Sequence, residues 1–226
     1  MRILALELST ETGSLALLDG DTVIWEKTWI GEGRQRRPIF PDLNALVSTE
    51  AWDWSRIDRF AVGVGPGAFS GLRMAVSGVM GMALPDNKPV MAVSSACALA
   101  GSILKETGAN QVVVLGDARR NELWAGCFKI SDRLVSRDGD WIVSAVEHLP
   151  DSLKKTGTVW VSPDWARIQG VLTSACPAGV SLIQEPRIPG AAMVARLVAG
   201  RVDSGMEGES LTPIYVHPAV SVAPRF

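Results

Sequence analysis

The sequence predicts an α/β protein, and three observations lead to this prediction. The chain begins with three β-rich segments joined by short turns, over residues 3–8, 14–18 and 22–29. A strand, a glycine turn and an apolar helix follow over residues 59–84, and another strand and helix come next. An antiparallel meander followed by alternating strands and helices differs from the order of a plain doubly wound sheet.

Length and charge exclude several classes of protein. The chain has 226 residues, 47% of them apolar, which is enough for one large domain or two small ones. A net charge of −2 argues against binding nucleic acid through bulk charge, but it allows RNA as a substrate shared with a basic partner. Cys97, Cys127 and Cys176 are far apart and indicate reduced thiols. With no apolar stretch of membrane length and no signal peptide, we expect a cytoplasmic protein that binds no membrane.

The remaining elements follow from hydrophobic periodicity and turn residues. In the first half we expect a loop over residues 31–37, helices over 38–48, 72–84 and 95–104, and strands over 59–64 and 89–93. In the second half we expect strands over 111–115, 122–130, 134–136, 140–143, 158–161 and 180–183, and helices over 146–154 and 191–199. The sequence therefore predicts an N-terminal lobe of residues 1–104, a smaller C-terminal lobe of residues 105–210, and a tail of residues 211–226 that can return to the first lobe.

A glycine-rich turn separates the strand at residues 59–64 from the apolar helix. Gly65, Pro66 and Gly67 break the strand, and Ser70 is the expected N-cap. Free N–H groups at a helix start attract anions, so one interpretation is a phosphate-binding turn that ends at Gly71. The turn lacks both the Gly-Lys-Ser/Thr ending of a P-loop and the spacing of a dinucleotide fold. The other interpretation is a tight strand-to-helix connection that binds no ligand.

The helix at residues 72–84 has almost no polar face. Arg73 and Ser77 are its polar members, and small residues such as Ala75 and Gly78 recur at three- and four-residue spacing. Such a helix is either sandwiched inside its own domain, or half buried there and half buried in a partner. Methionines such as Met82 suit an adaptable contact surface. The residues alone leave both interpretations open.

Motifs for catalysis and for metal binding are missing from the sequence. The two histidines, His148 and His217, are far apart, and no HxxxH, HExxH or CxxC spacing occurs. No GxSxG elbow marks a nucleophile. We therefore expect no catalytic residue and no metal site.

A second turn carries charges of both signs. Asp117 begins this turn, and Arg119 and Arg120 follow. The two guanidinium groups can bind a carboxylate or a phosphate. Alternatively, Asp117 forms an Asx-type turn and the arginines are solvated.

Three segments together resemble the TsaB family, also called YeaZ, of bacterial tRNA threonylcarbamoyladenosine synthesis. They are residues 3–11 (ILALELSTE), 63–73 (GVGPGAFSGLR) and 116–122 (GDARRNE), with residues 212–215 (TPIY) as a weaker fourth. The resemblance covers nearly the whole chain in order and length. The order of elements in the first half is also similar to one lobe of the actin, hexokinase and Hsp70 superfamily.

The resemblance implies a fold and a role. The fold would be the actin-like ATPase fold, which is ribonuclease H-like, with two small lobes and mixed sheets. The role would be that of a non-catalytic subunit that pairs with the paralogue TsaD, which transfers threonylcarbamoyl to N6 of adenosine 37 of tRNAs reading ANN codons. The ATPase TsaE joins this pair, tRNA is bound through the complex, and the subunit alone forms a homodimer. No cofactor would be intrinsic to this chain, while the complex uses ATP and magnesium.

The resemblance also implies three sets of site residues. The partner interface would consist of Pro38, Phe40, Leu43, Leu46, Leu72, Arg73, Ala75, Val76, Gly78, Val79 and Met82. A nucleotide or phosphate turn would contain Glu7, Ser9, Thr10, Gly65, Gly67, Ser70 and Gly71. An anion-binding turn would contain Asp117, Arg119 and Arg120.

Two departures from the family pattern bear on these expectations. Glu7 stands where the family usually has aspartate, and Gln35 and Arg36 stand where it often has histidine and serine. In actin-like kinases an acid in the first strand orients magnesium through water, and the alternative for Glu7 is a set of local hydrogen bonds. The alternative functions are those of a small actin-like ATP-dependent phosphotransferase and of an M22-type peptidase. The first needs a nucleotide clamped between the lobes, and the second needs a nucleophile or a metal.

Overall fold

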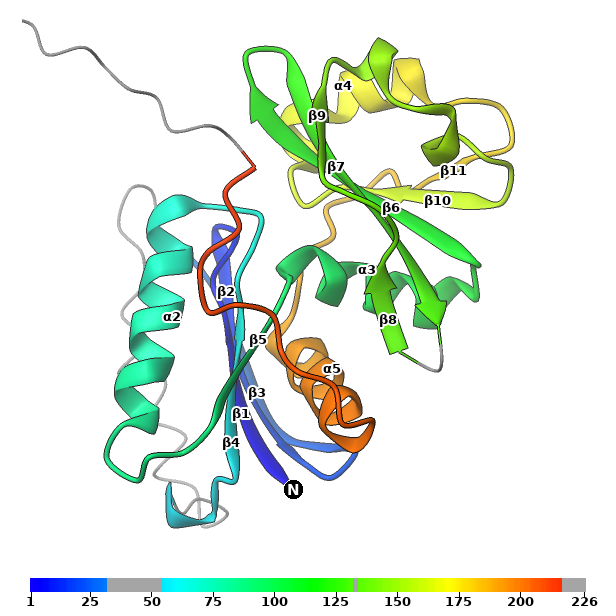
Figure 1. Ribbon diagram of the computed structural model, residues 1–226. Helices are drawn as coiled ribbons and strands as arrows, with labels where there is room; N and C mark the ends of the chain where they lie inside the picture. Colours follow the sequence, from blue (N-terminus) through cyan, green and yellow to red (C-terminus); the bar gives the residue numbers. More distant parts are fainter. Residues whose placement is uncertain (32–53, 132–133, 217–226) are drawn as a thin grey trace, which may run out of the picture.

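Two lobes, each built around a mixed β-sheet, make up the protein (Figure 1). The computed structural model describes residues 1–31, 54–131 and 134–216. The helix predicted over residues 38–48 lies outside these ranges, together with Gln35, Arg36 and His217 and the predicted interface residues Pro38, Phe40, Leu43 and Leu46. The expected α/β class with two lobes and mixed sheets is confirmed.

The first sheet has five strands in the order β3-β2-β1-β4-β5. Strands β1 (Arg2–Glu7), β2 (Thr12–Asp19) and β3 (Thr22–Ile30) form the antiparallel meander, and β4 (Arg59–Gly63) and β5 (Val90–Val93) extend it in parallel. The 3₁₀ turn η1 (Trp54–Arg56) precedes β4, and helix α2 (Phe69–Ala83) connects β4 to β5.

The second sheet repeats the pattern of the first. Its order, β8-β7-β6-β10-β11, again places an antiparallel meander beside two parallel strands. The strands are β6 (Gln111–Arg119), β7 (Glu122–Ser131), β8 (Leu134–Arg137), β10 (Thr158–Val161) and β11 (Ser181–Leu182), and β9 (Ile142–Ser144) adds a second pairing to β7. Helix α4 (Trp165–Ala175) connects β10 to β11, as α2 connects β4 to β5.

Strand β1 shows why its sequence is almost entirely apolar. Alternate side chains of a strand point to opposite faces of the sheet. Ile3 and Ala5 pack into one hydrophobic cluster, whereas Leu4 and Leu6 pack into another on the opposite face. Both faces are covered by helices, so every residue of β1 after Arg2 is buried.

The last helix of each half packs against the sheet of the other half. Helix α3 (Ser95–Thr107) contacts β6, β7 and β8, whereas α5 (Ala191–Asp203) contacts all five strands of the first sheet. α3 and α5 also touch each other, and one hydrophobic cluster joins Ile3 of the first sheet to Val112 of the second. The placement of residues 191–203 in the C-terminal lobe is therefore corrected, because these residues cover the N-terminal sheet.

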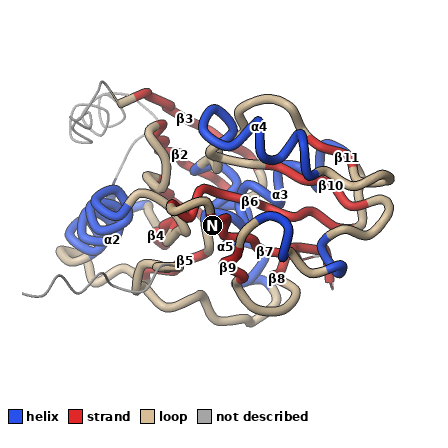
Figure 2. Tube along the Cα trace, turned by 90° about the horizontal axis from the view of Figure 1, so that it is seen from above, coloured by secondary structure: helices blue, strands red, loops and turns tan. Residues whose placement is uncertain are grey.

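α2 lies at the outer side of the first lobe, away from the second sheet (Figures 1 and 2). It begins at Phe69 rather than at Leu72, with Ala68 as its N-cap. Ser70 is thus not the N-cap, because it lies inside the helix and is exposed. None of the helices in the described ranges is both long and apolar enough to span a membrane.

One other predicted element is wrong, and one helix was missed. A helix was expected over residues 146–154, but the structure has the 3₁₀ turns η2 (Val146–His148) and η3 (Asp151–Leu153). Pro150 separates them, because proline has no N–H for a continuous helix. α4 was not predicted at all.

Residues 208–216 form a segment that we call the C-terminal strap. The Glu209 N–H donates to the Ala92 carbonyl at 2.9 Å, and the Ile214 N–H donates to the Val64 carbonyl at 2.8 Å. The side chain of Ile214 packs against the hydrophobic cluster beneath α2. The strap therefore runs along the free edge of β5 and back to the glycine turn.

Candidate functional site

The turn between β1 and β2 is closed by its own carboxylate. Glu7 is 0% exposed, and its Oε1 accepts a hydrogen bond from the Ser9 N–H at 2.6 Å. A Cβ at Gly63 would overlap Glu7 Oε2, so the side chain fits only against a glycine. Ser9 is 3% exposed, and the Thr10 hydroxyl donates to the Thr12 carbonyl at 2.8 Å. The Glu7 carboxylate therefore accepts a local hydrogen bond from its own turn inside the fold.

The glycine turn is packed between the β1–β2 turn and the start of α3. The Gly65 N–H donates to Ser95 Oγ at 2.9 Å, and the Gly65 carbonyl accepts from Ser94 Oγ at 2.9 Å. The Ala68 N–H donates to the Ser9 carbonyl at 2.7 Å. A Cβ at Gly67 would overlap this same carbonyl, so glycine is needed for the two turns to meet. This geometry favours a tight connection over a phosphate cradle.

The turn between β6 and β7 is held by charged side chains at the start of α4, from its N-cap Asp164 and from Arg167. The Asp117 N–H donates to Asp164 Oδ2 at 2.9 Å. Asp117 Oδ1 accepts from the Arg119 N–H at 2.8 Å, which is the Asx-type turn considered above. Asp117 Oδ2 lies 3.1 Å from Arg119 Nη1 and 3.5 Å from Arg167 Nε, and Arg167 also pairs with Asp164. Arg120 is exposed and forms no ion pair with any described residue.

The residues of the predicted nucleotide or phosphate turn come from two turns that lie together in the structure, and the predicted anion-binding turn lies apart from them. The β1–β2 turn and the glycine turn touch each other through Ser9 and Gly67, while the Asp117 turn lies in the other lobe. Each lobe supplies a carboxylate of its own to its turn. Glu7 accepts from the Ser9 N–H in the first lobe, and Asp164 accepts from the Asp117 N–H in the second. An incoming phosphate would have to displace these carboxylates and would be repelled by their charge. Anion binding at either turn stays a prediction.

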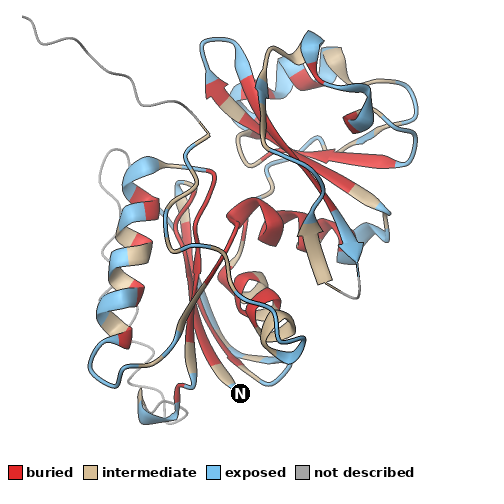
Figure 3. Cartoon of the chain, in the orientation of Figure 1, coloured by how far each residue is buried: buried red, intermediate tan, exposed pale blue. Residues whose placement is uncertain are grey.

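α2 is buried on one side and exposed on the other (Figure 3). Three of the predicted interface residues, Leu72, Ala75 and Val79, are at most 1% exposed, because they face the first sheet. They cannot contact a partner unless the lobe opens, so their assignment to the interface is corrected. Arg73 is exposed, and Val76, Gly78 and Met82 are half-buried.

The exposed side of α2 carries large apolar residues that sequence reasoning missed. Phe69, Met80 and Leu84 are 54%, 50% and 77% exposed. Gly81 lies on the same side, and no atom of a described residue lies within 4 Å of a Cβ built there. Phe69 and Met80 are eleven residues apart, which is about three helical turns, so they lie on the same side of the helix. This spacing is the signal in the sequence that could have identified the exposed side.

One exposed cluster connects α2 to the strap. The Arg73 guanidinium carbon lies 3.8 Å from the centroid of the Phe69 ring, and this ring lies 5.1 Å from that of Tyr215. Arg73 Nε also donates to the Tyr215 hydroxyl at 3.1 Å. The cluster holds the end of the strap against the first turn of α2.

Metal-ligating side chains do not gather in the part of the chain that the structure describes. Within it, no group of three or more His, Cys, Asp or Glu side chains is placed to hold a metal ion. His148 lies in η2. Two of the cysteines, Cys97 and Cys127, are buried.

A family model and two curated relatives that resemble this chain all concern the synthesis of tRNA threonylcarbamoyladenosine. Residues 37–149 match the family model of TsaD, described as tRNA N6-adenosine threonylcarbamoyltransferase. The tRNA threonylcarbamoyladenosine biosynthesis protein TsaB of Escherichia coli is 32% identical over 181 residues, which are 70% of this chain and 78% of that protein. The protein of the same name from Haemophilus influenzae is 34% identical over 127 residues, which are 55% of this chain but only 52% of that protein.

Solved structures agree with these relatives. YeaZ from Pseudomonas aeruginosa has a TM-score of 0.79 and 27% identity, over 95% of this chain and 99% of that chain. An activator of 2-hydroxyisocaproyl-CoA dehydratase from Clostridium difficile has a TM-score of 0.50 and 12% identity over 93% of this chain and 100% of that chain, and this shows the fold alone. The expected actin-like fold is confirmed, and the chain belongs to the TsaB (YeaZ) family.

Proposed function

We propose that this chain is a non-catalytic subunit in the biosynthesis of tRNA threonylcarbamoyladenosine, and that it pairs with a TsaD paralogue through the exposed side of α2. The observation that carries the proposal is the division of α2 into a buried side and an exposed apolar side. Exposed Phe69 and Met80 on α2, together with exposed Leu84 at its C-cap, are typical of a surface that another protein covers. The name of the Escherichia coli relative supports the pathway.

The small residues of α2 support a helix as the contacting element. Gly81 has open space around its Cα on the exposed side, so another helix can approach closely there. Met80 adds an unbranched, polarizable side chain that adapts to the shape of its partner. We propose that the segment at residues 38–48, outside the described ranges, completes this interface.

The two occupied turns support a role without phosphoryl transfer. A phosphotransferase needs backbone N–H groups that are free to bind phosphate. Here the Ser9 N–H and the Asp117 N–H already donate to carboxylates. This observation also favours the proposal that no nucleotide is intrinsic to this subunit, and that ATP and magnesium act elsewhere in the complex.

The remaining parts of the proposal follow from the family. In the assembled complex TsaD carries out the transfer to N6 of adenosine 37, TsaE joins as the ATPase, and tRNA is bound by the complex as a whole. The isolated subunit forms a homodimer through the same side of α2, and the complex works in the cytoplasm.

The test compares two exposed glycines that lie on different helices. Gly81 of α2 and Gly170 of α4 are both exposed, and no atom of a described residue lies within 4 Å of a Cβ built at either. Arginine is a better helix former than glycine by about 1 kcal/mol, so both substitutions should keep or improve stability. We expect Gly81→Arg to abolish the one-to-one complex with TsaD in size-exclusion light scattering, and Gly170→Arg to leave it intact.

Two outcomes would contradict the proposal. Equal complex formation by the two variants would place the interface away from α2. The proposed pairing with TsaD would itself be wrong if the unmodified proteins formed no complex at micromolar concentration with nucleotide present. In that case ATP binding in the presence of magnesium would support the phosphotransferase alternative.

A further inference from the structure

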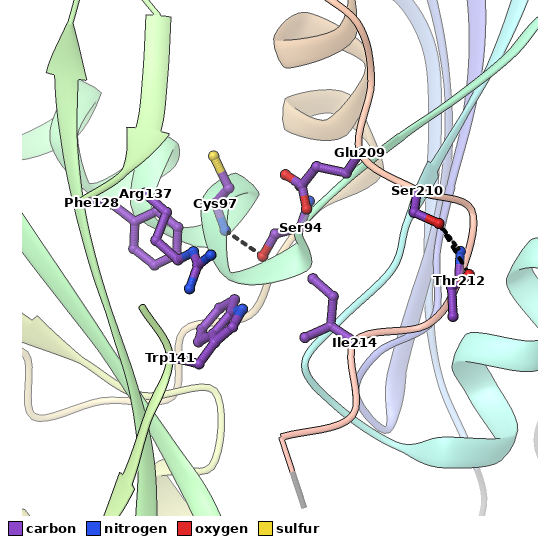
Figure 4. Close-up of a pocket in the computed structure, with 9 residues that line it drawn as sticks. All are labelled: Ser94, Cys97, Phe128, Arg137, Trp141, Glu209, Ser210, Thr212 and Ile214. Atoms are coloured by element: carbon purple, nitrogen blue, oxygen red, sulfur yellow. Dashed lines mark hydrogen bonds between the residues drawn. The ribbon is translucent and has the colours of Figure 1, made fainter. Parts of the chain in front are cut away.

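A cavity of about 410 Å³ lies between the two lobes and beside the strap (Figure 4). It adjoins the glycine turn, because the hydroxyl of its lining residue Ser94 donates to the Gly65 carbonyl. One wall comes from the second lobe, the opposite wall from the strap, and the start of α3 forms the floor. Its volume is within the range of small-molecule sites. The lining residues are Ser94, Cys97, Phe128, Arg137, Trp141, Glu209, Ser210, Thr212 and Ile214.

The wall from the second lobe presents a positive charge on an aromatic surface. The Arg137 guanidinium carbon lies 4.9 Å from the centroid of the Trp141 ring. Trp141 is fixed by edge-on contacts with Trp124 and Phe128, whose ring centroids lie at 5.9 and 6.1 Å. Arg137 forms no ion pair with any residue in the described ranges, so its charge is available to a ligand.

The negative charge in the lining is already engaged. Glu209 Oε1 accepts from the Ser94 N–H at 3.0 Å and from Arg201 at 3.1 Å. Arg201 therefore balances the carboxylate of Glu209 at short range. Burial raises the pKa of the Cys97 thiol to about 12, so this side chain is neutral at physiological pH. The charge that remains in the cavity is that of Arg137.

Apolar side chains lie opposite this charge. Ile214 projects into the cavity from the strap, facing Trp141 and Arg137 across it (Figure 4). Phe128 extends the aromatic wall, and Ser210 and Thr212 donate and accept within the strap at 3.0 Å. A flat apolar group thus fits between Trp141 and Ile214, with a negative group at the guanidinium.

We propose that this cavity binds a small organic anion, in which a carboxylate or phosphate group pairs with Arg137 and a flat apolar body lies between Trp141 and Ile214. The site is separate from the interface on α2, so it does not depend on the pairing proposed above. It is also separate from the β1–β2 and β6–β7 turns, whose residues do not line the cavity.

The experiment uses four probes that share one ring and differ in charge: benzoate, phenyl phosphate, benzyl alcohol and benzylamine. The indole N–H resonance of Trp141, assigned with a Trp141→Phe variant of the full chain, reports binding at the cavity. We expect benzoate and phenyl phosphate to shift this resonance at millimolar concentration, and the alcohol and the amine to bind at least about tenfold more weakly. The tighter of the two anions identifies the head group.

The matched variants are Arg137→Gln and Arg56→Gln, which replace two exposed arginines of different lobes. We expect Arg137→Gln to weaken binding of the anions at least about tenfold, and Arg56→Gln to leave it unchanged. The proposal is wrong if the alcohol binds as tightly as benzoate, if Arg137→Gln binds like the unmodified chain, or if no probe shifts Trp141. Arg137 is exposed, so a folding defect is not expected, and a thermal melt of each variant verifies this.

Discussion

Glu7 shows at the scale of one residue how a carboxylate inside the fold occupies a position that a phosphate ligand would need. It is completely buried, and its Oε1 accepts the hydrogen bond of the Ser9 N–H. Gly63 leaves the space in which the longer side chain of glutamate lies. The carboxylate therefore belongs to the turn, and we expect its replacement to lower mainly the stability of the fold.

We expect Glu7→Ala to lower the free energy of unfolding by about 1–3 kcal/mol, because the buried Ser9 N–H loses its acceptor. Glu7→Gln should lower it less, because the amide oxygen can still accept. Urea denaturation of both variants measures the difference. A change below about 0.5 kcal/mol for Glu7→Ala would mean that the turn does not depend on this hydrogen bond.

At the scale of the element, α2 and the β6–β7 turn each contain residues whose environment depends on the surrounding fold. The polar residues of α2 (Ser70, Arg73 and Ser77) are all exposed and mark one side of the helix, but its many apolar residues leave the edges of the buried side undefined without the sheet. The β6–β7 turn places Arg119, Arg120 and Asn121 at φ angles of 64°, 52° and 63°. This left-handed region is costly for arginine and tolerated by asparagine.

We expect Arg120→Asn to raise the thermal midpoint by about 2–4 °C, because asparagine tolerates a φ of 52° with about 1 kcal/mol less strain. Arg120→Lys keeps the same constraint at Cβ and should leave the midpoint unchanged. Thermal unfolding followed by circular dichroism measures both variants. A lower midpoint for Arg120→Asn would indicate that the arginine side chain itself stabilises the turn.

At the scale of the whole molecule, the two halves are joined by the exchange of their last helices. α5 covers the first sheet, and its first N–H, at Ala191, donates to the buried Ser14 Oγ at 2.9 Å. α3 covers the second sheet in return. Neither half can bury its apolar surface alone, although each has a complete sheet of its own.

We expect a fragment of residues 1–104 to remain unfolded by itself, because the face of the first sheet that contains Ile3 and Ala5 lacks α5. Co-expression with residues 105–226 should restore a folded complex. Amide NMR spectra and urea denaturation of the fragment and of the pair measure this. Cooperative unfolding of the fragment alone would support the lobe boundary after residue 104 as a true domain boundary.

The sequence by itself determined most of the strands and helices, the positions of the three turns and the family, because these depend on residues close together in the chain. The exceptions are α4 and the 3₁₀ turns η2 and η3. The three strands of the first meander, the Gly65–Gly67 break and the Asx turn at Asp117 all have local causes. Only the tertiary structure decided where the buried side of α2 ends, which sheet α5 covers, and where the Glu7 carboxylate lies. These depend on contacts between distant segments, as in the hydrogen bond that joins Ser14 to Ala191 across 177 positions. Local periodicity contains no information about such partners. The hydrophobic effect is non-directional, so it favours burial of an apolar face but does not determine which distant segment covers that face.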